Sequence, residues 1–108
     1  MSFRVLLTDD ATRDLEEIYD YIARRDAIGT ADHVLEQVQR AFASLCELPE
    51  RGVYPKELLA LGIREYREIF FKPYRIIYKV SNKMVYVLLI ADGRRDMQAL
   101  LQRRLLEP

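Results

Sequence analysis

Three arginines have the type and spacing to act on an anion. Arg75 lies in the run of residues 74–78, and Arg94 and Arg95 follow Gly93 after a long apolar stretch. A planar guanidinium binds a phosphate or a carboxylate through two parallel hydrogen bonds. If the apolar stretch pairs with the run that holds Arg75, these side chains come to neighbouring parts of one sheet. Such a cluster suits RNA, DNA or an acidic protein segment.

The same arginines have an alternative role as partners in surface ion pairs. Glu65, Glu68 and Asp96 are near them in the sequence and offer carboxylates on a solvated face. Surface ion pairs are common and contribute little to stability. Both interpretations of the arginines stay open at this stage.

The tyrosines raise the same question for nucleic acids. Tyr66, Tyr74, Tyr78 and Tyr86 fall in β-type runs that also hold basic residues. Aromatic faces beside arginines stack nucleobases in sheet-based RNA-binding proteins. Tyrosine is also an ordinary strand residue, and the chain lacks the glycine–aromatic signature of such proteins. The pattern therefore favours a structural role.

Few other kinds of chemistry are open to this chain. The single cysteine, Cys46, excludes an internal disulfide, and with the single histidine, His33, it excludes cysteine- and histidine-based metal centres. No glycine-rich phosphate loop, nucleophile elbow or carboxylate pair at acid–base spacing is present. We therefore expect no cofactor and no metal, and nothing in the chain demands catalysis.

The charge balance excludes a globally basic nucleic-acid coat protein and a globally acidic mimic. The 108 residues carry 17 basic and 17 acidic side chains. Their distribution is uneven, since residues 1–63 hold 7 basic and 12 acidic side chains while residues 64–108 hold 10 and 5. No stretch approaches about 18 apolar residues, and the start has no basic leader. We expect one domain, residues 1–108, in a cytoplasmic protein with no membrane contact.

Two amphipathic helices are predicted in the first half. Thr8 and two aspartates precede a helical spacing of apolar residues from Ala11 to Ile22. A second helical pattern runs from Ala31 to Leu48 and stops before Pro49. The break between them is short, so the helices should form an antiparallel hairpin.

Strands are predicted in the second half, after an irregular connector at residues 49–63 with one turn of helix at residues 56–60. Residues 64–72, 74–80 and 84–91 are rich in β-branched and aromatic side chains and are separated by short turns. The last run is apolar on both faces and should be central. A final helix follows. The fold class is α+β, in the order β-α-α-β-β-β-α, with the N-terminal helical hairpin packed on an antiparallel sheet and a C-terminal helix.

The pattern as a whole resembles the RelE/ParE toxin superfamily of type II toxin–antitoxin modules, and it is closer to ParE. The resemblance spans nearly the full chain. It rests on the Tyr-Arg-Ile-Ile-Tyr run at residues 74–78, the valine-rich strand after it, and the Gly-Arg-Arg-Asp run at residues 93–96. The opening helix, with Leu15, Ile18 and Ile22, is similar to that of ParE-type members.

The resemblance implies one of two activities. RelE-like members cut messenger RNA on the ribosome with basic residues and a tyrosine or histidine near the C-terminus, whereas ParE-like members poison DNA gyrase. Arg75 and Arg95 match two RelE-type arginines. Tyr66 and Glu68 stand where RelE-type enzymes have lysines, and Leu101 stands where they have the catalytic tyrosine. These departures favour the ParE-like activity, which is protein binding and not catalysis.

The alternative is a ribosome-dependent, metal-independent endoribonuclease. Attack by a 2′-hydroxyl needs proton transfer as well as stabilisation of the phosphate. Arg75 and Arg95 suit the phosphate, Glu68 would be the base and Tyr66 the acid. An ion pair between Glu68 and its neighbour Arg67 would oppose the first of these proton-transfer roles. A third possibility is a degenerate member kept only as an antitoxin-binding corepressor module.

The resemblance also implies partners. A cognate antitoxin should fold across apolar grooves, above all the groove between the first two helices. The target is expected to be DNA gyrase, or the ribosome with messenger RNA in the alternative. The candidate antitoxin-binding residues are Leu15, Ile18, Ile22, Val38 and Phe42. The candidate target-binding residues are Arg75, Arg94, Arg95, Arg103 and Arg104.

Overall fold

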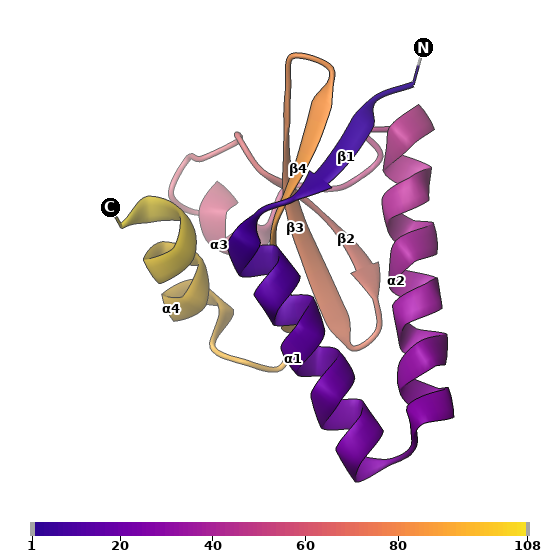
Figure 1. Cartoon of the computed structure of the whole chain (residues 1–108). Helices are drawn as coiled ribbons and strands as arrows, with labels where there is room; N and C mark the ends of the chain where they lie inside the picture. The colour runs from indigo at the N-terminus through magenta and orange to yellow at the C-terminus, as the bar shows by residue number, and fades with distance from the viewer. Residues whose placement is uncertain (1, 108) are drawn as a thin grey trace.

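A computed structural model describes residues 2–107 of the chain. Figure 1 shows two long helices and a shorter C-terminal one around a twisted sheet. The elements, in chain order, are β1 (Arg4–Leu7), α1 (Asp9–Arg25), α2 (Ile28–Glu47), α3 (Lys56–Leu59), β2 (Arg67–Phe71), β3 (Tyr74–Ser81), β4 (Met84–Asp92), α4 (Met97–Leu101) and the π-helical turn η1 (Gln102–Leu106). This order confirms the predicted α+β fold.

The sheet has the strand order β1-β4-β3-β2. Strands β2, β3 and β4 form the predicted antiparallel meander, and β4 is central as expected. The prediction of an antiparallel sheet is wrong for β1, which pairs in parallel with β4, with Leu7 opposite Val87. The helical hairpin between β1 and the meander is long enough to allow this, because only a tight turn forces neighbouring strands to run antiparallel.

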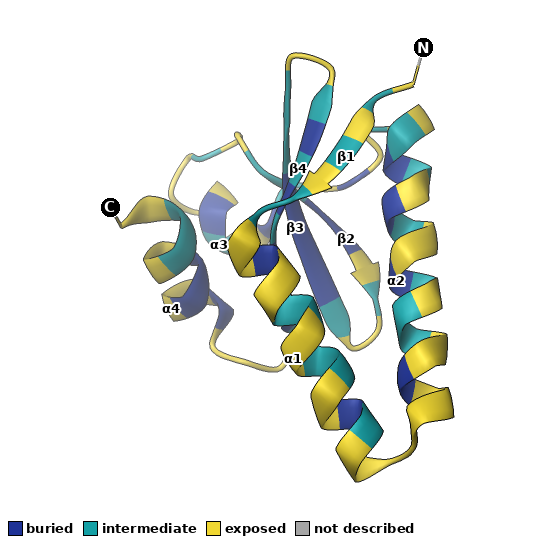
Figure 2. Cartoon of the chain, in the orientation of Figure 1, coloured by how far each residue is buried: buried dark blue, intermediate teal, exposed yellow. Residues whose placement is uncertain are grey.

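The helical hairpin covers one face of the sheet. The Thr8 hydroxyl accepts a hydrogen bond from the Ala11 amide at 3.1 Å and caps α1, as the sequence predicts. The buried core of this face is apolar apart from the Tyr78 hydroxyl, which accepts from the Gly52 amide. Figure 2 shows the buried stripes of both helices turned toward the sheet. The largest fully buried side chains here are Tyr78, Leu45, Ile76, Ile90, Val38, Val85 and Val87.

The opposite face is covered by α3 and by α4 with η1. In Figure 1 these elements lie to the left of the sheet and α2 lies to its right. Their apolar residues form a second cluster with Ile77 and Leu89 of the strands. The predicted turn of helix at residues 56–60 is confirmed as α3. It brings Leu58 into this cluster.

Strand β2 is shorter than predicted. It begins at Arg67 instead of residue 64, so Tyr66 precedes the strand and the prediction that it lies on one is wrong. The Arg67 side chain donates to the carbonyl oxygen of Gly52 at 3.0 Å, and its guanidinium stacks over the Tyr54 ring. These contacts tie the connector to the start of β2, so the residues before Arg67 follow the connector instead of the sheet.

Candidate functional site

Arg75 is buried on the face of the sheet that α3 covers. Its Nε donates to Oε1 of Glu68 on β2 at 2.7 Å, and its two terminal nitrogens donate to both oxygens of Glu57 on α3, at 2.7 and 2.8 Å. The exposed fractions of the side chains are 10% for Arg75, 14% for Glu57 and 5% for Glu68. One guanidinium is thus held by two carboxylates from two other elements.

The three charged groups of this cluster differ in the direction in which their environment shifts the pKa. Hydrogen bonds to Glu57 raise the pKa of the Arg75 guanidinium, so it stays charged. The same hydrogen bonds hold the pKa of Glu57 below its ordinary value. Burial raises the pKa of Glu68, against the opposing effect of its hydrogen bond with Arg75. The predicted ion pair between Glu68 and its neighbour Arg67 is wrong, because the two side chains leave the strand on opposite faces.

Gly93 joins the end of β4 to this cluster. Its amide donates to the carbonyl oxygen of Pro73 at 2.8 Å. A Cβ atom at this position would lie 3.0 Å from Cδ of Arg75, which is tighter than ordinary packing allows. A larger residue here would push on the stem of Arg75.

Arg94 and Arg95 follow Gly93 and are exposed. Asp92 accepts hydrogen bonds from the Arg94 amide and from its Nε, both at 2.9 Å. The Arg94 side chain lowers the pKa of Asp92 to about 2. Both arginines line a groove of about 890 Å³ between α1 and the end of the sheet, where Arg24, Arg25 and Lys72 also lie. Arg94 and Arg95, at the junction between β4 and α4, therefore form part of one wall of this groove.

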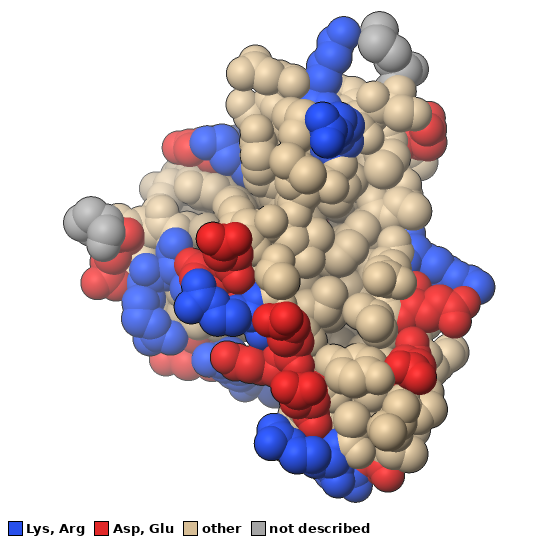
Figure 3. Space-filling view, in the orientation of Figure 1, with Lys and Arg blue, Asp and Glu red and all other residues tan. Residues whose placement is uncertain are grey.

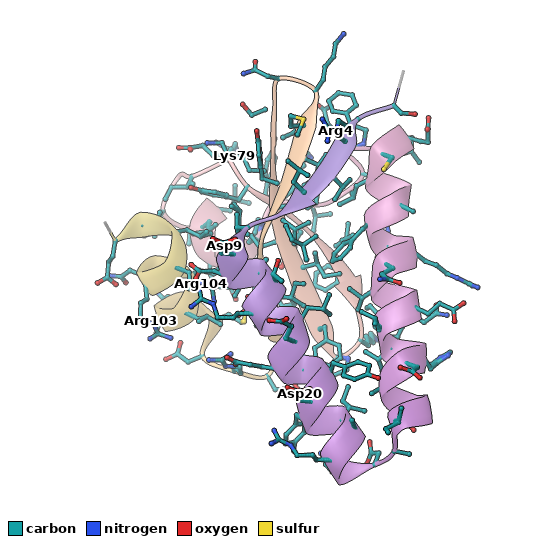
Figure 4. All side chains as sticks on the ribbon, viewed as in Figure 1. Arg4, Asp9, Asp20, Lys79, Arg103 and Arg104 are labelled. Atoms are coloured by element: carbon teal, nitrogen blue, oxygen red, sulfur yellow. The ribbon has the colours of Figure 1, made fainter. Side chains whose placement is uncertain are left out.

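Arg104 holds the C-terminal segment against α1. Its terminal nitrogens donate to both oxygens of Asp14 at 2.9 and 3.1 Å, and one of them also donates to the carbonyl oxygen of Leu88 at 3.1 Å. Leu88 is free to accept because a register shift between β3 and β4 skips it. Asp14 also accepts from the amide of Ile90, beyond the end of β1. In Figure 4 Arg104 lies between the C-terminal helix and α1.

The neighbouring Arg103 is exposed. Figure 4 shows it on the outer side of the C-terminal helix, away from α1. In the space-filling view of Figure 3, acidic side chains follow α1 and basic ones gather beside the C-terminal helix. The uneven charge of the sequence is thus also uneven in space, and Arg103 belongs to its basic part.

The five apolar candidates for antitoxin binding separate into three places. Leu15 lines an outer groove of about 580 Å³ with Leu35 and Tyr19, between α1 and α2. Ile18 and Ile22 line the groove beside Arg94 and Arg95. The exposed fractions of Val38 and Phe42 are 1% and 9%, and both lie in the core beneath the hairpin.

The comparisons with known proteins agree with this fold. A family model described as the ParE toxin of type II toxin–antitoxin system, parDE, matches residues 5–97. This chain belongs to the ParE toxin family. Toxin ParE3 of Caulobacter vibrioides is 25% identical over 101 residues, which cover 94% of this chain and 97% of that protein.

Two solved structures share the fold. A chain of the chromosomal ParDE TA system from P. aeruginosa superposes with a TM-score of 0.70 at 19% identity, over 84% of this chain and 96% of that one. A chain of the toxin–antitoxin complex RelBE2 from Mycobacterium tuberculosis gives a TM-score of 0.57 at 22% identity, over 85% and 99%. These superpositions show a fold shared with both chains, and the family match agrees with the predicted resemblance to the RelE/ParE superfamily on its ParE side.

The residues that the sequence suggested for RNA cleavage do not come together in this fold as an accessible set of acid, base and phosphate-binding groups. Glu68 is bonded to Arg75, and Tyr66 is half-buried beside the second apolar cluster, where burial raises the pKa of its hydroxyl. Leu101, at the position of the RelE-type tyrosine, is fully buried. Arg95 is exposed and lines the groove beside α1, whereas the fork of Arg75 is buried. The sheet brings Glu68 and Arg75 together and leaves the others apart.

Sequence reasoning missed three residues of this region, namely Glu57, Asp14 and, as a packing requirement, Gly93. Glu57 lies 18 positions before Arg75 and Asp14 lies 90 before Arg104. Glu57 stands next to Lys56 on its turn, so it looked like half of a local charge pair. Asp14 looked like any other carboxylate of an acidic helix.

Among residues 2–107, no group of His, Cys, Asp and Glu side chains is arranged to hold a metal, and no helix is long and apolar enough to cross a membrane.

Proposed function

We propose that this toxin inhibits DNA gyrase by protein binding and is neutralised by a cognate antitoxin. Membership of the ParE toxin family supports the first part. The two structural neighbours belong to a ParDE TA system and a RelBE2 toxin–antitoxin complex, which supports an antitoxin as the partner. The site of action would be the cytoplasm, where gyrase works.

The observation that carries this proposal over RNA cleavage is the state of the proton-transfer positions. The side chain of Leu101 has no group that can donate or accept a proton, and it is fully buried. Glu68 accepts from Arg75, and burial moves the pKa of Tyr66 further from neutrality. Cleavage through a 2′-hydroxyl needs a base and an acid within reach of the phosphate. Inhibition by binding needs neither.

The proposed target surface consists of Arg94, Arg95 and Arg103, which are exposed. Arg75 and Arg104 have their guanidinium groups committed to internal carboxylates, and contact with a target would require those ion pairs to break. We therefore assign them a structural role in the toxin. Exposed arginines contribute to recognition of both acidic protein surfaces and the DNA that gyrase holds.

The deciding experiment follows DNA and protein synthesis together after a pulse of expression without antitoxin. We expect DNA synthesis to fall first, and purified gyrase to be inhibited by the toxin. Earlier loss of protein synthesis would instead establish the ribosome as the target. Growth with neither affected would establish the degenerate binding module.

The target surface is tested with the double variant Arg94→Ala and Arg95→Ala, which should lose toxicity while its melting temperature stays unchanged. The double variant Arg13→Ala and Arg40→Ala is the matched control, because it removes the same charge from two exposed ion pairs on the helices. Retained toxicity in the first variant would remove the junction from the target surface.

Antitoxin binding should raise the stability of the toxin. Leu15 and Leu35 line the open groove between α1 and α2, and a bound segment would cover them. We expect a higher melting temperature for the complex than for the free toxin. Equal melting temperatures would contradict neutralisation through this groove.

A further inference from the structure

The fork of Arg75 is an anion-binding group that is filled from within the protein. The two terminal nitrogens of its guanidinium donate to the two oxygens of Glu57 in the paired geometry with which arginine also binds a phosphate. The third donor, Nε, is taken by Glu68. Each of the three nitrogens of the guanidinium therefore donates to a carboxylate of the same chain.

Two features indicate that Glu57 does more than balance a buried charge. Glu68 alone balances Arg75, since one carboxylate neutralises one guanidinium, so Glu57 is a second carboxylate on the same cation, with the exposed Lys56 next to it in the sequence. In addition, Glu57 comes from a four-residue helix in the connector, whereas Arg75 and Glu68 lie in paired strands. The carboxylate that closes the fork thus belongs to a separate element placed over the sheet.

The surroundings of the fork would suit a phosphate if Glu57 were absent. Gly93 has no side chain and crosses the stem of Arg75 closely, which leaves the backbone near the fork. The exposed Lys56 precedes Glu57 on α3 and acts electrostatically on both Glu57 and Glu68, so it is a cation beside the fork. Phe70 stands opposite Arg75 in the register of β2 and β3 and is 54% exposed, which offers an aromatic surface beside the fork.

We propose that Glu57 is a specificity-determining residue that closes the fork of Arg75 to external phosphate groups. It withholds phosphate and phosphodiester binding from this face of the sheet. The proposal goes beyond gyrase inhibition, because it concerns a ligand that the fold excludes and a buried arginine outside the exposed set assigned to the target. Removal of the Glu57 carboxylate opens the terminal nitrogens of Arg75, while Glu68 still holds the stem in place.

The test compares Glu57→Ala with Glu65→Ala in the full chain. Glu65 is an exposed carboxylate near Lys79, so its removal changes the net charge equally without touching the fork. Binding of a short fluorescein-labelled single-stranded RNA is measured by anisotropy at low salt, and inorganic phosphate is titrated against the Arg75 Nε–H signal by NMR. For Glu57→Ala we expect an RNA affinity about tenfold above that of Glu65→Ala, from one opened bidentate site.

The double variant Glu57→Ala with Arg75→Ala should lose this gain. A gain that persists without Arg75, or equal RNA binding by Glu57→Ala and Glu65→Ala, would overturn the proposal. Phosphate binding at Arg75 without RNA binding would support the opened fork and overturn its extension to phosphodiesters. If Glu57→Ala fails to fold, Glu57→Gln keeps the shape of the side chain, removes its charge and is expected to give a smaller gain in the same direction. None of these binding assays uses gyrase, so a negative result would contradict the role of Glu57 without bearing on gyrase inhibition.

Discussion

Arg75 and Arg94 lie at the same end of the sheet, but they are held in different ways. The partners of Arg75 come from β2 and α3, 7 and 18 positions away, and the cluster is buried. The partner of Arg94 is Asp92, two positions away, and the Arg94 side chain is 80% exposed. A partner that is distant in sequence ties elements together, whereas a local partner orients a side chain and leaves it accessible. The first arrangement contributes to the fold, and the second leaves a surface for a target.

The largest expected effect is that of Arg75→Ala. It leaves Glu57 and Glu68 close together without their cation, and breaking a buried ion pair costs about 3–5 kcal/mol. We expect the free energy of unfolding, measured by urea denaturation, to fall by about that amount. Arg94→Ala is the control and should leave the urea midpoint unchanged. If both variants unfold at the same urea concentration, the distinction between the two regions is lost.

The pair Arg104 and Arg103 sharpens the same comparison with two adjacent residues. Arg104→Ala removes the hydrogen bonds to Asp14 and to the Leu88 carbonyl, and loss of such charged bonds costs about 1.5–3 kcal/mol. Arg103→Ala removes only an exposed side chain and should change stability by less than about 0.5 kcal/mol. Thermal and urea unfolding of both variants test this difference. A larger loss for Arg103→Ala would show that the C-terminal segment is held by other contacts.

The smallest expected effect is on the pH dependence of the free energy of unfolding. This dependence has opposite signs for the two carboxylates that bind Arg75. Arg75 lowers the pKa of Glu57, so ionised Glu57 stabilises the fold above its ordinary value of 4.5, and this contribution is lost as pH falls through the lowered pKa. Burial raises the pKa of Glu68, so the folded state keeps its proton longer, and stability falls as pH rises from 4.5 through the raised pKa.

Urea unfolding of Glu57→Gln, Glu68→Gln and the unchanged chain at a series of pH values tests these signs. Relative to the unchanged chain, the stability of Glu57→Gln should fall as pH rises, and that of Glu68→Gln should increase. Slopes of the same sign would mean that the two carboxylates share one environment.

Local patterns were sufficient to predict most of the elements. Thr8 and the apolar spacing after it predicted the start of α1, and the two-sided apolar character of β4 predicted its central place. The parallel pairing of β1 could not be predicted in this way, because nothing in four residues indicates which edge they join. The start of β2 was missed for a related reason, since Arg67 is fixed by carbonyl oxygens of the connector.

The sequence by itself determined the fold class, the order of elements and the resemblance to the RelE/ParE superfamily, because these depend on periodicity and on short motifs such as residues 74–78 and 93–96. Only the tertiary structure decided which arginines are accessible. Arg75, Arg94, Arg95, Arg103 and Arg104 are the same residue type with the same charge. Their difference arises from carboxylates that folding brings from α1, α3 and β2, at separations that no local pattern encodes.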